Sequence, residues 1–168
     1  MTGFMRKTAF APIVNTDSKI LILGTIPGTE SLRRQQYYGH KFNQFWKIIF
    51  SLFDEEFSDE YDKRIALLLR HNIALWDVLQ SCEGQGSADT DIKNEQANDF
   101  DSFFKQYPGI RTVFFASRKA EQFYKKYVGL NNRLTFYTLP SPSTANARMT
   151  LQQKIEKWEL IKDKLYIK

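Results

Sequence analysis

Cysteine and histidine are nearly absent from this sequence. Its 168 residues include one cysteine, Cys82, and two histidines, His40 and His71. One cysteine cannot form an internal disulfide, and it cannot hold an iron–sulfur cluster, which needs several thiolates. Together the three residues also leave too few ligands for a usual zinc site. We therefore expect a protein without metal or cofactor, in the reducing cytoplasm.

Long apolar runs are missing as well. No stretch approaches the roughly 18 apolar residues of a membrane helix, and no signal peptide is recognisable, so we expect no membrane association. A hydrophobic fraction of 42% and an aromatic fraction of 15% argue against disorder. A chain of this length fits one domain, which we expect to cover residues 1–168 and to act as a monomer.

Neither sign of charge dominates. The chain has 24 Lys and Arg against 19 Asp and Glu, a formal net charge of +5. This mild basic excess fits a polyanionic partner such as nucleic acid, but many soluble proteins share it, so it carries little weight.

Short apolar runs alternate with amphipathic segments along the chain. The pattern predicts strands at 19–23, 111–115 and 134–139, with 73–79 as a strand or a turn. It predicts helices at 43–53, 59–71, 99–106, 117–127 and 150–166, and a long loop at 83–98. Strands that alternate with helices indicate an α/β fold, here a three-layer α/β/α arrangement around a short parallel sheet of about four strands.

Two loops carry the unusual residues. The first strand runs into a Gly-Pro-Gly turn, Gly24 to Gly28, and then into Tyr37-Tyr38-Gly39-His40 and Asn43. The second loop, 140–148, follows the last strand. The carboxyl ends of parallel strands share one edge, where such folds bind ligands, so the loops are expected to face each other across a cleft. Polar groups combined with flat rings suit a planar, polar ligand such as a nucleobase.

These residues resemble the uracil-DNA glycosylase superfamily, and within it the mismatch-specific and hypoxanthine (deoxyinosine) DNA glycosylase branch. The resemblance rests on four blocks whose order and spacing span nearly the whole chain: Gly24-Thr-Ile-Pro-Gly28 with Ser31-Leu32, Tyr37-Tyr-Gly-His-Lys-Phe-Asn-Gln-Phe-Trp46, Ala74-Leu-Trp-Asp-Val-Leu79, and Leu139-Pro-Ser-Pro-Ser-Thr-Ala-Asn-Ala147.

The resemblance implies a uracil-DNA-glycosylase-like fold and a monofunctional glycosylase of base-excision repair. Such an enzyme flips a deaminated base, hypoxanthine or uracil, out of DNA and hydrolyses its N-glycosidic bond, without metal or cofactor. Its partner is DNA that contains deaminated or mispaired bases. The implied roles are catalysis by Asn43, substrate binding by Gly24, Thr25, Ile26, Pro27, Gly28, Tyr38 and His40, and DNA binding by Ser141, Pro142, Ser143, Thr144, Ala145, Asn146 and Arg148.

The catalytic role of Asn43 follows from the branch. Mismatch-specific relatives carry a catalytic asparagine as the third residue of the first motif, where this chain has Ile26. In the hypoxanthine branch the asparagine of a His-Pro-x-Asn-x-Phe-Trp element acts instead. That asparagine corresponds to Asn43, with Lys41 in place of the proline. The matched loops hold one acid, Glu30, so no strong general base is evident.

Other interpretations stay open at this point. Ile26 in the first motif also fits a catalytically inactive nucleic-acid-binding homologue. An enzyme of free nucleosides is a third option, although it would need neither a DNA wedge nor a basic face. Tyr38 could be a core ring, His40 a structural hydrogen-bond partner, and Asn43 a helix N-cap.

Overall fold

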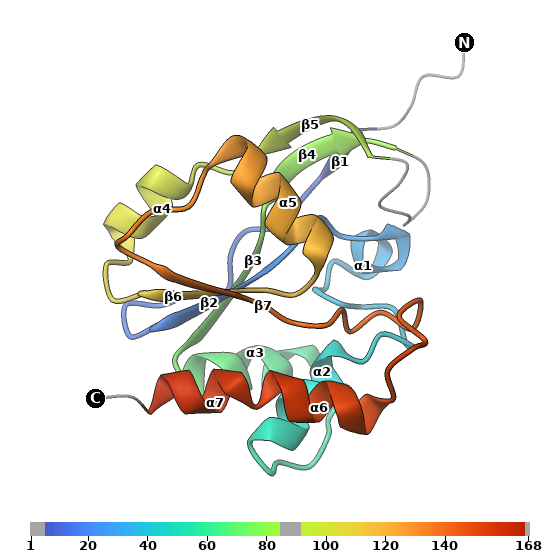
Figure 1. Cartoon of the computed structure of the whole chain (residues 1–168). Coiled ribbons are helices and arrows are strands. Elements are labelled where there is room, and N and C mark those ends of the chain that lie inside the picture. The colour runs from blue at the N-terminus through green and yellow to red at the C-terminus, as the bar shows by residue number, and fades with distance from the viewer. Residues whose placement is uncertain (1–5, 85–91, 167–168) are drawn as a thin grey trace.

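Four parallel strands form the main sheet of the computed structural model, which describes residues 6–84 and 92–166. Their order is β3-β2-β6-β7: β3 (Ile73–Asp77), β2 (Ile20–Gly24), β6 (Thr112–Phe115) and β7 (Thr135–Thr138). Gly24 pairs in register with Asp77, and Phe115 pairs with Thr138, so all four strands end at one edge (Figure 1). The predicted parallel sheet of about four strands is confirmed, and 73–77 is a strand.

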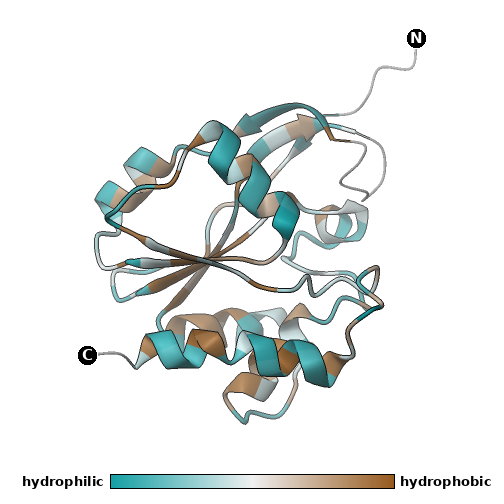
Figure 2. Cartoon of the chain, viewed as in Figure 1, coloured by the Kyte–Doolittle hydropathy of each residue, from teal (hydrophilic) through white to brown (hydrophobic). Residues whose placement is uncertain are grey.

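Helices cover both faces of this sheet, which confirms the three-layer prediction (Figure 1). Ile20 and Ile22 face one core and Leu21 and Leu23 face the other, so β2 is buried on both sides. One face carries α2 (Phe45–Leu52), α3 (Tyr61–Arg70), α6 (Leu151–Trp158) and α7 (Leu160–Leu165), and the other carries α4 (Phe100–Gln106) and α5 (Arg118–Tyr127). Burial on both faces explains why the sequence of β2 lacks polar alternation. The outward side of α5 is hydrophilic (Figure 2).

A second, antiparallel sheet was not predicted. It has the order β1-β4-β5, from β1 (Arg6–Thr8), β4 (Leu79–Glu83) and β5 (Lys93–Ala97). The prediction of one loop over 83–98 is therefore wrong for Lys93–Ala97; residues 85–91 lie outside the described part. No side chain of β5 is fully buried, so its sequence shows no apolar periodicity that would indicate a strand.

Two further differences concern helices. The first loop contains a short helix, α1 (Thr29–Arg34), and the predicted closing helix is divided into α6 and α7 at Glu159. Thr150 and Gln153 form a capping box at the start of α6.

Within the described residues, no helix has the length and apolar character needed to cross a membrane.

Candidate active site

A cavity of about 740 Å³ lies at the carboxyl edge of the main sheet, a size usual for small-molecule sites. Both predicted loops line it, so the expectation that they face each other is confirmed. Its wall includes Gly24, Thr25, Ile26, Pro27, Gly28, Tyr38, His40 and Asn43 from the first loop, and Ser141, Ser143, Thr144, Ala145 and Asn146 from the second. Two predicted residues lie outside the wall: Pro142 is buried, and Arg148 is exposed.

Gly24 lies where β2 passes closest to two polar side chains. A Cβ atom at this position would be 2.6 Å from Oδ1 of Asp77 and 2.8 Å from the Tyr38 hydroxyl. Cβ atoms do not approach other atoms so closely, so only glycine fits without displacement. The same geometry places the Tyr38 hydroxyl and the Asp77 carboxylate together at the end of β2.

We expect Gly24→Ala to destabilise the fold, because the added methyl group must displace Asp77 and Tyr38 from a packed site. Overpacking of this kind costs about 1–3 kcal/mol in the free energy of unfolding, which chemical denaturation measures. Adding Tyr38→Phe removes one of the two clashing atoms and should recover part of the loss. A Gly24→Ala protein as stable as the wild type would show that both side chains move away freely.

Tyr38 contributes a ring that is covered on one side. The ring stacks on buried Phe45, with 4.0 Å between centroids and an interplanar angle of 13°. Its backbone adopts a positive φ of 51°, which is uncommon for a residue with a side chain. The core interpretation therefore holds for the face against Phe45, while the residue also lines the cavity.

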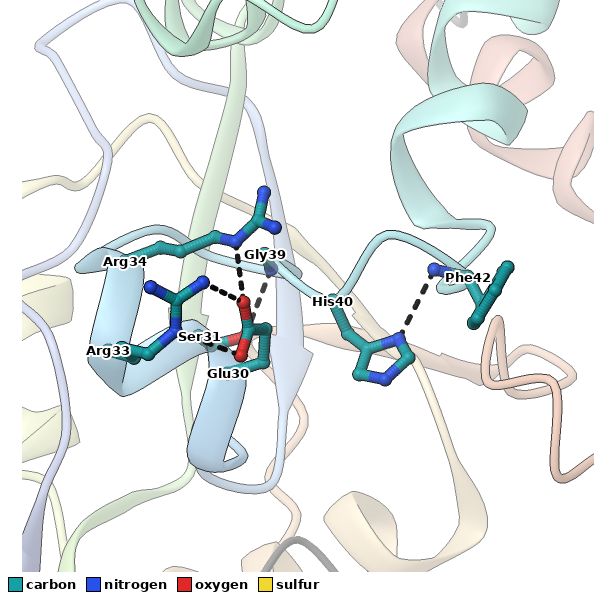
Figure 3. A network of polar contacts seen from close by, with 7 residues as sticks. All are labelled: Glu30, Ser31, Arg33, Arg34, Gly39, His40 and Phe42. Carbon is teal, nitrogen blue, oxygen red and sulfur yellow. Dashed lines mark hydrogen bonds and ion pairs between the residues drawn. The ribbon is translucent and has the colours of Figure 1, made fainter.

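The segment Tyr37-Tyr38-Gly39 is held in place by hydrogen bonds to the surrounding protein. Nε1 of Trp46 donates to the carbonyl of Tyr37 at 2.8 Å, and the Tyr37 hydroxyl donates to the carbonyl of Ala11 at 2.8 Å. The backbone N–H of Gly39 donates to Oγ of Ser31 at 3.0 Å (Figure 3). Burial raises the pKa of Tyr37, so its hydroxyl stays protonated and serves as a structural donor.

Asn43 lies two positions before the first residue of α2, whereas the sequence predicted a helix from residue 43. Its backbone N–H donates to the carbonyl of His40 at 2.9 Å, and its Oδ1 accepts from the backbone N–H of Phe45 at 2.9 Å. The formal N-cap residue is Gln44, so Asn43 caps the helix from one position earlier. An amide has a second lone pair on its oxygen and two N–H donors, which leaves Asn43 capacity to bind a ligand.

His40 is exposed at the mouth of the cavity. Its Nδ1 accepts from the backbone N–H of Phe42 at 3.2 Å (Figure 3). This bond requires an unprotonated Nδ1, and it supports the interpretation of His40 as a structural hydrogen-bond partner of the turn.

Asp77 is a cavity residue to which the sequence pattern assigned no role. It ends β3, is 4% exposed and lines the wall. A buried carboxylate is costly, so its presence at a ligand-binding edge indicates a functional group. It was overlooked because it stands within an apolar run; the available signal was an acid at the carboxyl end of a buried strand. The cavity therefore holds an acid besides Glu30.

Glu30, the acid noted in the sequence, is engaged elsewhere. Arg33 and Arg34 both hydrogen-bond its carboxylate, with Nε–O distances of 3.1 and 2.8 Å (Figure 3). These bonds lower the pKa of Glu30 to about 2. A carboxylate of such low basicity is a poor proton acceptor at neutral pH, so Asp77 is the better candidate for chemistry.

Lys154 joins the two loops, a role that the sequence did not indicate. It lies on α6, is 1% exposed, and its Nζ donates to Oε1 of Gln44 at 2.7 Å and to the carbonyl of Ser143 at 3.0 Å. The backbone N–H of Gln44 donates to the carbonyl of Pro142 at 2.9 Å. Burial lowers the pKa of Lys154. These bonds set the position of Asn43 relative to the second loop.

Hydrogen bonds within the second loop also stabilise its conformation. The backbone N–H of Ala145 donates to Oγ of Ser143 at 3.2 Å, and that of Asn146 donates to the carbonyl of Ser143 at 3.0 Å. Thr144 and Ala145 are exposed at its tip.

Across the described residues, no group of three or more His, Cys, Asp or Glu side chains is placed to hold a metal.

Comparison with known proteins finds relatives that are similar to this chain in sequence and in fold. The model of the Uracil DNA glycosylase superfamily matches residues 11–163. The hypoxanthine DNA glycosylase of Methanosarcina acetivorans is 35% identical over 158 residues, which cover 94% of this chain and 98% of the relative. That of Methanosarcina barkeri is 38% identical over 120 residues, covering 71% and 76%. The solution NMR structure of a putative uracil DNA glycosylase from M. acetivorans has a TM-score of 0.83 at 34% identity, covering 97% of this chain and 100% of that one. This chain therefore belongs to the uracil DNA glycosylase superfamily.

Proposed function

We propose that this protein is a monofunctional DNA glycosylase that hydrolyses the N-glycosidic bond of a flipped deaminated base, with hypoxanthine the first candidate and uracil the second. The observation that carries the proposal is one cavity lined by Asn43, Tyr38 and Asp77, in a chain 35% identical to a hypoxanthine DNA glycosylase. Ile26 lines the same cavity. Position 26 has no asparagine, but the polar side chains of Asn43 and Asp77 still line the cavity. Their presence favours an enzyme over an inactive homologue.

The reaction needs stabilisation at two points. Positive charge develops on the sugar as the bond breaks, and negative charge develops on the leaving base. We assign Asn43 to positioning the attacking water through its amide. The backbone N–H groups of the turn from Thr25 to Gly28 are suited to donate to the base, as glycine-rich turns do.

We assign Asp77 to recognition of the edge of the base. Deamination converts the N1 acceptor of adenine into an N–H donor in hypoxanthine, and the N3 acceptor of cytosine into an N–H donor in uracil. A carboxylate that is ionised only accepts hydrogen bonds, so Asp77 in that form favours the deaminated base over its parent. Guanine and thymine also carry such an N–H group, and their exclusion depends on the greater cost of flipping a well-paired base.

The second loop is assigned to DNA. Ser143–Asn146 forms a compact turn at the cavity mouth, which suits it to fill the space that a flipped nucleotide leaves. Such wedges offset the cost of unstacking. Arg148, exposed beyond this turn, is suited to bind a phosphate.

Tyr38 is expected to stack on the flipped base with the ring face opposite Phe45. Base–aromatic stacking contributes about 1–3 kcal/mol, so Tyr38→Ala should lower the rate of excision by about 5- to 150-fold. Tyr38→Phe keeps the ring and should retain most of the activity. Single-turnover excision beside a thermal melt separates stacking from lost packing. Equal losses in both variants would assign the role to the hydroxyl.

Oligonucleotide duplexes that contain hypoxanthine, uracil, xanthine or a mispaired thymine test the function. Alkaline cleavage after incubation detects the abasic sites that a glycosylase leaves. We expect excision of hypoxanthine and undiminished activity in excess chelator, because the chain offers few metal ligands. Binding without abasic sites on any substrate would instead indicate the inactive homologue, and activity that requires added metal would contradict the metal-free mechanism.

A further inference from the structure

Phe42 is an exposed aromatic residue in the segment between two residues that line the cavity. Its side chain is 60% exposed. Of the large hydrophobic residues that are exposed in the described part of the chain, it is the one flanked closely by cavity residues, His40 two positions before it and Asn43 directly after it. A single exposed apolar side chain is normal at a protein surface, so exposure alone indicates no partner. What distinguishes Phe42 is its place between two residues that line the cavity.

The turn that carries Phe42 is well supported. The backbone N–H of Asn43 donates to the carbonyl of His40 at 2.9 Å, which closes the turn, and Nδ1 of His40 accepts from the backbone N–H of Phe42 at 3.2 Å. Figure 3 shows the His40 ring beside this N–H and the Phe42 ring projecting beyond it. Directly after the turn, Phe45 and Trp46 are buried in the core. The backbone that carries the Phe42 ring is therefore held in a defined conformation.

A positive charge accompanies the ring. Nζ of Lys41 lies 4.8 Å from the centroid of Phe42, and Lys41 is itself exposed. A cation next to an exposed aromatic ring suits a ligand that offers a phosphate and a flat apolar face side by side. Nucleic acid offers both on each nucleotide.

Building on the proposed glycosylase function, we propose that Phe42 stacks on a base of the duplex that flanks the flipped nucleotide, with Lys41 at the adjacent phosphate. Flipping removes one neighbour from the flanking base and leaves its face uncovered. Phe42 enters from the first loop, while Ser143–Asn146 enters from the second loop across the cavity. Phe42 and the turn Ser143–Asn146 together hold the duplex open around the extruded nucleotide.

The test uses a duplex with a tetrahydrofuran abasic analogue, which has no base to excise, and 2-aminopurine beside the analogue. Fluorescence anisotropy gives Kd, and 2-aminopurine fluorescence reports stacking. We expect Phe42→Ala to raise Kd about tenfold and to relieve most of the quenching that the wild type causes, whereas Phe42→Trp should bind and quench like the wild type. Phe57→Ala is the matched control: Phe57 is also exposed, at 44%, but neither of its chain neighbours lines this cavity, and its removal should leave Kd unchanged.

Two outcomes would overturn the inference. Wild-type affinity and quenching in Phe42→Ala would show that the ring does not stack on DNA. A loss seen with a hypoxanthine duplex but not with the abasic duplex would show that Phe42 covers the flipped base instead. A thermal melt confirms folding, since exposed substitutions change stability little. Failure of the wild type to excise any deaminated base would refute the proposed function separately, and the abasic duplex would still report on Phe42.

Discussion

Asn43→Ala is expected to lose excision almost completely. Loss of an amide that positions the attacking water should lower the single-turnover rate on the order of 10²–10³-fold, by comparison with loss of one oxyanion donor. The bond from Phe45 to Oδ1 of Asn43 adds a second effect. Its loss removes a helix cap and should lower the free energy of unfolding by about 0.5–2 kcal/mol.

Asn43→Asp separates these two effects. The carboxylate keeps the shape of the side chain and the acceptor for the Phe45 N–H, and a negative charge is favourable at the start of α2. The variant should therefore melt close to the wild type. It lacks the amide donor but still accepts a hydrogen bond from water, so it should retain only a trace of excision. An Asn43→Ala protein that is destabilised but excises at the wild-type rate would show that Asn43 is a helix cap and has no catalytic role.

Asp77→Ala should produce the other large loss. A hydrogen bond to a charged group contributes about 1.5–3 kcal/mol, so removal of the acceptor should lower the rate on hypoxanthine by about 10- to 150-fold. Asp77→Asn retains an oxygen acceptor in the same place and should lose less. The amide can also rotate to donate, so the preference for hypoxanthine over adenine in the same sequence context should fall.

The same pair of variants tests a different role for Asp77. If its carboxylate accepts a proton from the attacking water, Asp77→Asn should be as damaging as Asp77→Ala, because an amide cannot take that proton. The ratio of the two single-turnover rates distinguishes recognition from base catalysis. A thermal melt of each variant is needed, since replacement of a buried carboxylate also changes stability.

The sequence alone predicted the main sheet, the helical layers on its two faces and the edge that carries the site, but it did not predict the antiparallel sheet β1-β4-β5 or helix α1. Ile20–Gly24 and Thr112–Phe115 are short, continuous apolar runs, and such runs separated by amphipathic segments fit strands covered by helices on both faces. Parallel strands end at one edge, so the glycine-rich turn after the first and the proline-rich loop after the last were expected there, and both line the cavity. The resemblance of these loops to a known superfamily was confirmed by the family match over residues 11–163.

Tertiary structure decided which polar groups are available in that cavity. Glu30 and Asp77 are both acids in the sequence, but α1 places two arginines on Glu30, whereas β3 buries Asp77 in the wall beside Gly24. Lys154 reaches Gln44 across 110 residues of sequence. Apolar periodicity records which side chains are buried, but it carries no information about the polar partners that distant segments supply. Those contacts arise only when the chain folds, and they determine which acid is paired with arginines and how the two loops are positioned.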